Sequence, residues 1–80
     1  MDPKYPPRDA TDAELFIRLA EEASEITKVC CKVLRFGVLN AHPQRPDKNN
    51  GQLMHNEMND LAALWYEITR RGLTHREPEA

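Results

Sequence analysis

The chain has 80 residues and a formal net charge of −2, with 11 basic and 13 acidic side chains mixed along it. Such a chain forms one small domain with a thin core, and the lack of a basic stripe disfavours nucleic acid as a main partner. The polar, proline-rich start and the lack of a long apolar run predict neither a signal peptide nor a membrane span, so we expect a soluble, cytoplasmic protein that oligomerises.

The first ten residues contain three of the prolines and predict an extended N-terminal arm (1–10). A helix is expected from Thr11 to about Phe36, because Thr11 and Glu14 match a capping box and Gly37 suits the position after a helix end. Apolar side chains then follow steps of four and three. The seam they define consists of Leu15, Leu19, Glu22, Ile26, Val29 and Val33. A carboxylate, Glu22, therefore stands where a leucine is expected.

Two adjacent cysteines, Cys30 and Cys31, lie within this helix. Neighbouring helical side chains point in different directions, so a disulfide between these two would be strained. No second Cys or His pair stands at metal-ligand spacing. We therefore expect two reduced thiols, with Cys30 on the apolar side of the helix and Cys31 facing away.

A loop of about a dozen residues, rich in proline and asparagine, follows Gly37, and its length for a helical connection indicates a functional role. A second helix is expected from Asn49 or Asn50, which cap it, to about Arg71, with Gly72 after its end. An open helix N-terminus at this point could also bind phosphate. The seam of the second helix consists of Met54, Met58, Leu61, Trp65 and Ile68, and its tryptophan is expected in the core or in an interface.

These elements predict an all-α fold, a helical hairpin over residues 11–72 followed by a polar tail (73–80). Two helices alone cannot surround a core. We therefore expect a four-helix bundle formed through homo-oligomerisation, as a homodimer or a homotetramer.

Two carboxylate pairs border the seams at the same i, i+3 spacing, Glu22 with Glu25 and Glu57 with Asp60. Packing of the two seams would bring the four carboxylates together beside the core. Desolvated carboxylates repel one another, so protonation or a cation must relieve the charge, and neither seam carries a lysine or an arginine. Oxygen-only ligands favour Mg²⁺, with Mn²⁺ as a substitute, and indicate a phosphorylated substrate. The lack of a Glu-x-x-His motif argues against a di-iron site.

An ordinary solvated face is the competing interpretation of these carboxylates. Glu22 could pair with Arg18, and Glu25 with Lys28, as exposed partners on one helix. The chain would then be a non-catalytic helical interaction protein. The shared spacing of the two acidic pairs, and their position beside apolar seams, favours the metal site.

The segment EEASE at Glu21–Glu25, followed by EMND at Glu57–Asp60, resembles the EExxE…ExxD signature of the MazG-like all-α nucleoside triphosphate pyrophosphohydrolases. The similarity covers about residues 15–68 and is to the small, single-domain phage and bacterial members. It implies Mg²⁺-dependent cleavage of a nucleoside or deoxynucleoside triphosphate between its α- and β-phosphates. The products would be a nucleoside monophosphate and pyrophosphate.

The resemblance also implies roles for individual residues. The metal ligands would be Glu22, Glu25, Glu57 and Asp60. Glu25 would also take the proton of the attacking water, with Glu21 in a supporting catalytic role. Phosphate contacts would come from Lys32, Lys28, Arg35, the loop or a partner subunit.

Two features depart from the family pattern. The gap between the two acidic motifs is longer than usual, and Asn59 stands where glycine is common. A degenerate member that binds metal and nucleotide without efficient turnover is therefore an alternative.

Phe36 and Tyr66, which the pattern leaves outside the seams, are candidates to stack on a base.

Overall fold

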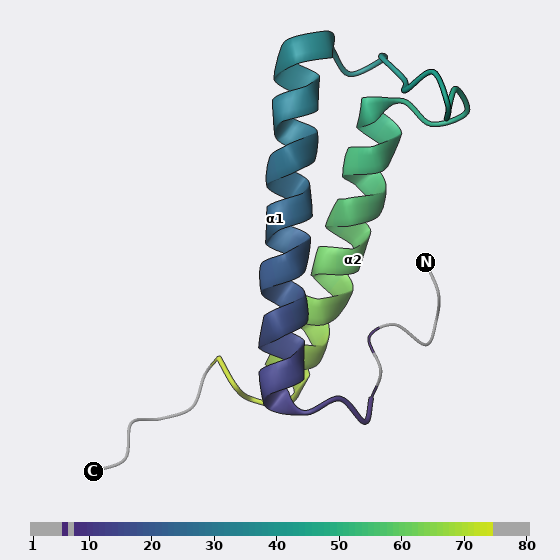
Figure 1. Ribbon diagram of the computed structural model, residues 1–80. Coiled ribbons are helices and arrows are strands. Elements are labelled where there is room, and N and C mark those ends of the chain that lie inside the picture. The colour runs from purple at the N-terminus through teal and green to yellow at the C-terminus, as the bar shows by residue number, and fades with distance from the viewer. Residues whose placement is uncertain (1–5, 7, 75–80) are drawn as a thin grey trace.

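The computed structural model describes residues 6 and 8–74 and contains two helices, α1 (Asp12–Phe36) and α2 (Asn50–Arg70), which run side by side in opposite directions (Figure 1). The predicted all-α hairpin is therefore confirmed. The pair is one helix thick, with a smallest dimension of 14 Å. Within the described ranges, no helix combines the length and the apolar character needed to cross a membrane.

Both helices begin at capping boxes. Thr11 Oγ1 accepts a hydrogen bond from the amide of Glu14 at 3.1 Å, and the Glu14 carboxylate accepts one from the amide of Thr11 at 3.5 Å. Asn49 and Gln52 form the same reciprocal pair at the start of α2, at 2.9 and 2.8 Å. Helix α1 ends at Gly37, whose φ of 92° lies in the left-handed region that favours glycine. The helix limits predicted from these residues are confirmed.

The core is small and lies at the end of the hairpin opposite the loop. It consists of Leu15, Leu64, Ile68 and Ala10, with Leu19 and Leu73 packed against them. Ala10 and Leu73, which the sequence assigns to the arm and the tail, thus contact the core. Of the predicted arm and tail, residues 1–5, 7 and 75–80 lie outside the described residues.

Helix α2 buries part of the predicted seam, since Ile68 is fully buried and Met54 and Leu61 are half-buried. Met58 and Trp65 of that seam are 45% and 52% exposed, so Trp65 does not lie in the core of the chain, and its placement in an interface stays a prediction. A second stripe towards α1 lies one position away and consists of Leu53, Glu57, Asp60, Leu64 and Glu67, all buried or half-buried. Because three of its five members are acidic, a search for apolar side chains selects the neighbouring stripe instead.

Helix α1 buries the seam that its sequence predicts, since Leu15 and Val29 are buried and the other members are half-buried. Both cysteines are exposed and carry free thiols. Placing Cys30 on the apolar side is therefore wrong. Val29 occupies the buried position, and at about 100° per residue the next side chain turns towards solvent.

The loop between the helices is tied to the first turn of α2. The amide of Asn50 donates to the carbonyl oxygen of Asn40 at 2.8 Å, and the amide of Gly51 donates to that of Val38 at 2.9 Å. The side-chain amide of Asn50, itself buried, donates to the carbonyl oxygen of Gly37 at 3.0 Å. A Cβ atom on Gly51 would lie 2.7 Å from Val38 Cγ1, so a larger residue at this position would displace the Val38 side chain.

The rest of the loop folds through two tight turns. The amide of Arg45 donates to the carbonyl oxygen of His42 at 2.8 Å, and the amide of Lys48 donates to that of Arg45 at 3.2 Å. An isolated antiparallel bridge joins Ala41 to Asn49. These bonds give His42, Arg45 and Lys48 a defined course beside the two helices.

Candidate metal and phosphate site

Three carboxylates meet where the seam of α1 crosses the facing stripe of α2. Glu22, Glu57 and Asp60 each bring one carboxylate oxygen to within 4.8 Å of the others, and all three side chains are half-buried. Ligand oxygens around a single Mg²⁺ lie at most about 4.2 Å apart, because each metal–oxygen distance is about 2.1 Å. Small side-chain adjustments would therefore let these oxygens hold one ion.

Among the described residues, no ion pair involves Glu22, Glu57 or Asp60. Glu22 Oε2 is buried and has no hydrogen-bond partner among the described residues. Burial raises the pKa of Glu22 from 4.5 to about 7, and the adjacent carboxylates of Glu57, Asp60 and Glu25 act in the same direction. At neutral pH the cluster therefore retains a proton or attracts a cation.

Glu25 and Glu21, the other two carboxylates of the first motif, lie outside the cluster. Glu25 pairs with Lys28 at 3.3 Å on the exposed surface of α1, as the competing interpretation expects. In the described part of the chain, no ion pair joins Arg18 to Glu22, and Glu21 is exposed. The structure thus brings together three of the four predicted metal ligands, and the roles given to Glu25 and Glu21 stay predictions.

A cavity of about 480 Å³ lies beside the cluster, between α1, the loop and α2. Glu57 belongs both to the cluster and to the cavity wall. The other charged or titratable side chains of the wall are Glu25, Lys32, His42, Arg45 and Lys48. The volume is typical of small-molecule sites. Carboxylates beside cations form the set of groups that a complex of a metal ion and a phosphate requires.

Of the three predicted phosphate-binding residues, only Lys32 lines this cavity. Lys28 is paired with Glu25, and Arg35 is exposed. The individual loop residues His42, Arg45 and Lys48 were not identified from the sequence, because hydrogen bonds to α2 determine the course of the loop and leave no periodic pattern. The available signal was three basic side chains within one long loop between the two acidic motifs.

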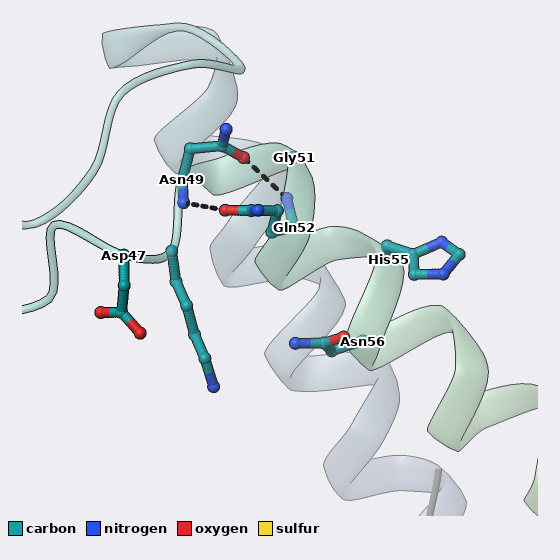
Figure 2. A pocket seen from close by; sticks show the side chains of 7 residues that line it. Asp47, Asn49, Gly51, Gln52, His55 and Asn56 are labelled. Carbon is teal, nitrogen blue, oxygen red and sulfur yellow. Dashed lines mark hydrogen bonds between the residues drawn. The ribbon is translucent and has the colours of Figure 1, made fainter.

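The N-terminus of α2 does not offer the open amides that phosphate binding would need. The amide of Gln52 donates to Asn49 Oδ1 (Figure 2), and the amides of Asn50 and Gly51 donate to loop carbonyl oxygens. The hollow beside this turn is lined by Asp47, Lys48, Asn49, Gln52, His55 and Asn56. Since the first three amides already have acceptors, the helix end is not open, which disfavours the alternative of a phosphate at this end.

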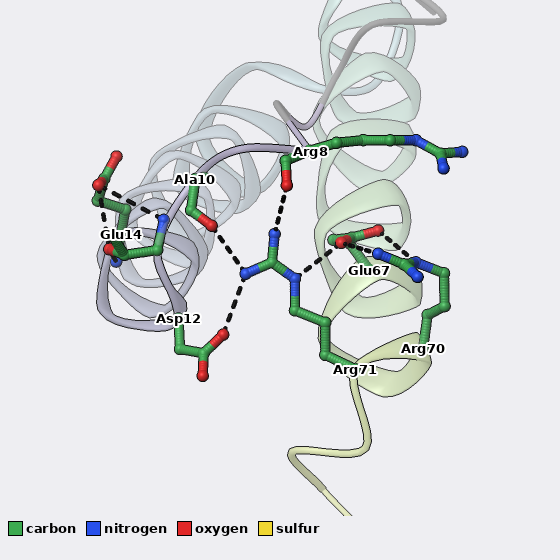
Figure 3. A network of polar contacts seen from close by, with 8 residues as sticks. Arg8, Ala10, Asp12, Glu14, Glu67, Arg70 and Arg71 are labelled. Atoms are coloured by element: carbon green, nitrogen blue, oxygen red, sulfur yellow. Dashed lines mark hydrogen bonds and ion pairs between the residues drawn. The ribbon is translucent and has the colours of Figure 1, made fainter.

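A second acidic site, at the opposite end of the hairpin, has its own cations. The carboxylate of Glu67, which is 4% exposed, accepts from Arg70 at 2.9 and 2.7 Å and from Arg71 at 2.8 Å. Arg71 also donates to three acceptors before and within the first turn of α1, Asp12 Oδ1 and the carbonyl oxygens of Ala10 and Arg8 (Figure 3). Hydrogen bonds from Arg70 and Arg71 lower the pKa of Glu67 to about 2. This network is structural, because it joins α2 to the start of α1.

No model of a known protein family matches the chain, and neither a curated protein nor a solved structure is significantly similar to it. The resemblance to the MazG-like enzymes therefore depends on the two acidic motifs and their order along the chain. The geometry of the site is independent of that resemblance. It consists of a half-buried carboxylate cluster that shares Glu57 with a cavity lined by cations.

Proposed function

We propose that the chain is a Mg²⁺-dependent nucleoside triphosphate pyrophosphohydrolase of the MazG-like type, in which Mn²⁺ can substitute. The observation that carries this proposal is the approach of Glu22, Glu57 and Asp60 to within 4.8 Å, together with a buried oxygen of Glu22 that has no partner among the described residues. Clustered oxygen ligands with excess negative charge suit a hard divalent cation. The cations of the adjoining cavity suit its phosphorylated substrate.

The residues of the site divide metal binding from phosphate binding. Glu22, Glu57 and Asp60 hold the ion, which, when bound, neutralises the triphosphate and acidifies a coordinated water. Lys32, with Arg45 and Lys48 of the loop, donates charge-assisted hydrogen bonds to phosphate oxygens. Phosphate contacts supplied by a loop account for the long gap between the acidic motifs.

Glu25 is the proposed general base, because it lines the cavity and its side chain is half exposed, at 51%. It accepts a proton as the water oxygen adds to the α-phosphorus, and the bond from that phosphorus to the α–β bridging oxygen breaks. The nucleoside monophosphate keeps the water oxygen, and pyrophosphate leaves. Glu21 has only a supporting role, since it is exposed and lies outside the cluster.

Self-association into a four-helix bundle, as a homodimer or a homotetramer, is part of the proposal. Its support is the predicted α2 seam, which leaves Met58 and Trp65 exposed on a molecule one helix thick. A second copy would cover this face and complete the core. Light scattering of the purified chain that gave only the monomer mass would contradict this part.

The activity is tested by measuring pyrophosphate released from a panel of ribo- and deoxyribonucleoside triphosphates with Mg²⁺, with Mn²⁺ and with EDTA. We expect release with either ion and none with EDTA. Glu57→Gln should reduce the rate by at least about a hundredfold, the upper range seen when a group that only orients a metal ligand is lost. Asp9→Asn, which neutralises an exposed carboxylate at the other end of the hairpin, is the matched control and should retain the rate.

Two results would refute the enzyme. One is the absence of pyrophosphate release from every nucleotide of the panel in the presence of Mg²⁺. The other is an equal loss of activity in Glu57→Gln and Asp9→Asn, because the carboxylate cluster would then have no special part in the reaction. Circular dichroism of each variant verifies that both stay folded.

A further inference from the structure

A second cavity, of about 330 Å³, adjoins the cation-lined one. The two cavities share three lining residues, Lys32, His42 and Leu53. The second cavity continues along the loop to the end of α1, where its wall includes Phe36 and Pro43. Because the walls are shared, a single ligand can extend from one cavity into the other.

The chemistry of the two walls differs. The first cavity carries Arg45 and Lys48 together with carboxylates, whereas the second has none of these and adds the rings of Phe36 and Pro43. Phe36 is the last residue of α1 and is 60% exposed, so its ring is not used in the core. An exposed aromatic face stacks well on a planar heteroaromatic ring. The second cavity therefore suits the uncharged end of a ligand whose anionic end lies in the first.

Polar groups of this wall are held in place by the loop bonds. Asn50 is 4% exposed, and its amide and side chain bind the carbonyl oxygens of Asn40 and Gly37 at 2.8 and 3.0 Å. Asn40 and Asn50 both line the cavity, and an asparagine amide offers a donor and an acceptor to the edge of a base. The wall is thus fixed before a ligand arrives.

We infer that this second cavity holds the base of the nucleotide whose phosphates lie among Lys32, Arg45 and Lys48, with the ring of Phe36 stacked on the base. The inference depends on the proposed function, because it takes the ligand of the first cavity to be a nucleotide. It adds the site of base recognition and assigns it to the loop and the end of α1. Tyr66, the other exposed aromatic candidate, does not line either cavity.

The test separates the two ends of the ligand. Calorimetry in Mg²⁺ measures the binding of α,β-methylene nucleoside triphosphates, in which the scissile bridge is blocked, and of inorganic tripolyphosphate, which has no base. Phe36→Ala should weaken the nucleotide analogues by about tenfold and leave tripolyphosphate unchanged, as expected for the loss of one stacking ring. Phe36→Trp should retain the affinity. Leu39→Ala, in the same loop but 83% exposed and outside both walls, should change neither ligand.

Each contrary result has a different meaning. If tripolyphosphate and the analogues bind the unmodified chain but Phe36→Ala binds the analogues normally, the base does not stack on Phe36 and the inference is overturned while the proposed function stands. If neither ligand binds the unmodified chain in Mg²⁺, the proposed function fails, and the inference fails with it. If Phe36→Ala weakens tripolyphosphate as much as the analogues, the cavity has no role specific to the base.

Discussion

Glu67 and Glu57 belong to the same stripe of α2, yet the two ends of that stripe provide them with opposite surroundings. Glu67 accepts hydrogen bonds from Arg70 and Arg71, which lower its pKa to about 2. Glu57 instead lies beside Glu22 and Asp60. Burial of Glu22, together with the adjacent carboxylates of Glu57 and Asp60, raises the pKa of Glu22 to about 7. One buried carboxylate is compensated by the chain itself, and the other cluster is left with excess negative charge.

A structural acidic site and a candidate binding site thus differ in the partners of their carboxylates. A carboxylate that is stabilised by its own arginines needs nothing from solution, and its pKa falls. Carboxylates that are stabilised by nothing nearby cost folding free energy, which a bound cation can return. Both sites consist of carboxylates that are at least half-buried, so the neighbouring charges are what distinguishes them.

The largest expected effect comes from removing the compensated carboxylate. Glu67→Ala should destabilise the chain by about 3 kcal/mol, because it leaves two arginines facing one another where a carboxylate joined them. Arg71 is only 16% exposed and also holds the segment before α1. Urea denaturation measures the loss as a lower midpoint at unchanged slope.

Glu25→Ala is the matched control for this change. It removes a carboxylate from an exposed pair with Lys28, whose partners are 65% and 51% exposed, and should cost less than about 0.5 kcal/mol. Equal losses in the two variants would mean that the Glu67 network is no stronger than a surface ion pair. The contrast between the two ends of the stripe would then disappear.

The pH dependence of stability should distinguish the two sites by sign. The folded pKa of Glu67 is lowered from 4.5 to about 2, so its contribution is complete above pH 4.5 and is lost as the pH falls towards 2. The folded pKa of Glu22 is raised from 4.5 to about 7, so folding favours its protonated form and stability falls as the pH rises from 4.5 to 7. The loss of unfolding free energy between pH 4.5 and pH 2 should be on the order of 2 kcal/mol. The loss between pH 4.5 and pH 7 should be smaller, because Glu22 is partly solvated.

Urea midpoints measured from pH 2 to pH 8 in EDTA test both windows. Glu67→Gln should remove the acid loss, and Glu22→Gln should remove the neutral one. Mg²⁺ should reduce only the neutral loss, since the ion binds the ionised cluster. A single variant that removed both losses would show that the two sites titrate together and would contradict their separation.

The sequence predicts the helices well because their limits depend on local chemistry. The Thr11–Glu14 capping box and the positive φ of Gly37 are properties of neighbouring residues, and the structure contains both. The choice of the contact face on α2 is not local. Trp65 and Met58 make one stripe the more hydrophobic, but the helix turns the acidic stripe of Glu57 and Asp60 towards α1.

The same division applies to the candidate site, because its helical residues were predictable from the sequence and its loop residues were not. Glu22, Glu57 and Asp60 come from regular positions on helices, so spacing alone brings them together. The loop cations Arg45 and Lys48 are positioned by bonds such as that from the amide of Asn50 to the carbonyl oxygen of Asn40, which no periodicity encodes. The arginine pair on Glu67 was missed for another reason, since basic residues in the last turn of a helix are already explained by the helix dipole.

The smallest expected effect on stability comes from a change within the carboxylate cluster of Glu22, Glu57 and Asp60. In EDTA, Glu57→Gln should stabilise the chain by about 1 kcal/mol, because it relieves repulsion with Glu22 and Asp60 while keeping the shape of the side chain. Addition of Mg²⁺ should then raise the melting temperature of the unmodified chain and leave that of the variant unchanged. Glu21→Gln, an equal change at an exposed neighbouring position, should show neither effect. A melting temperature that does not respond to Mg²⁺, together with unchanged stability in Glu57→Gln, would indicate a solvated acidic face, as expected for a non-catalytic helical interaction protein.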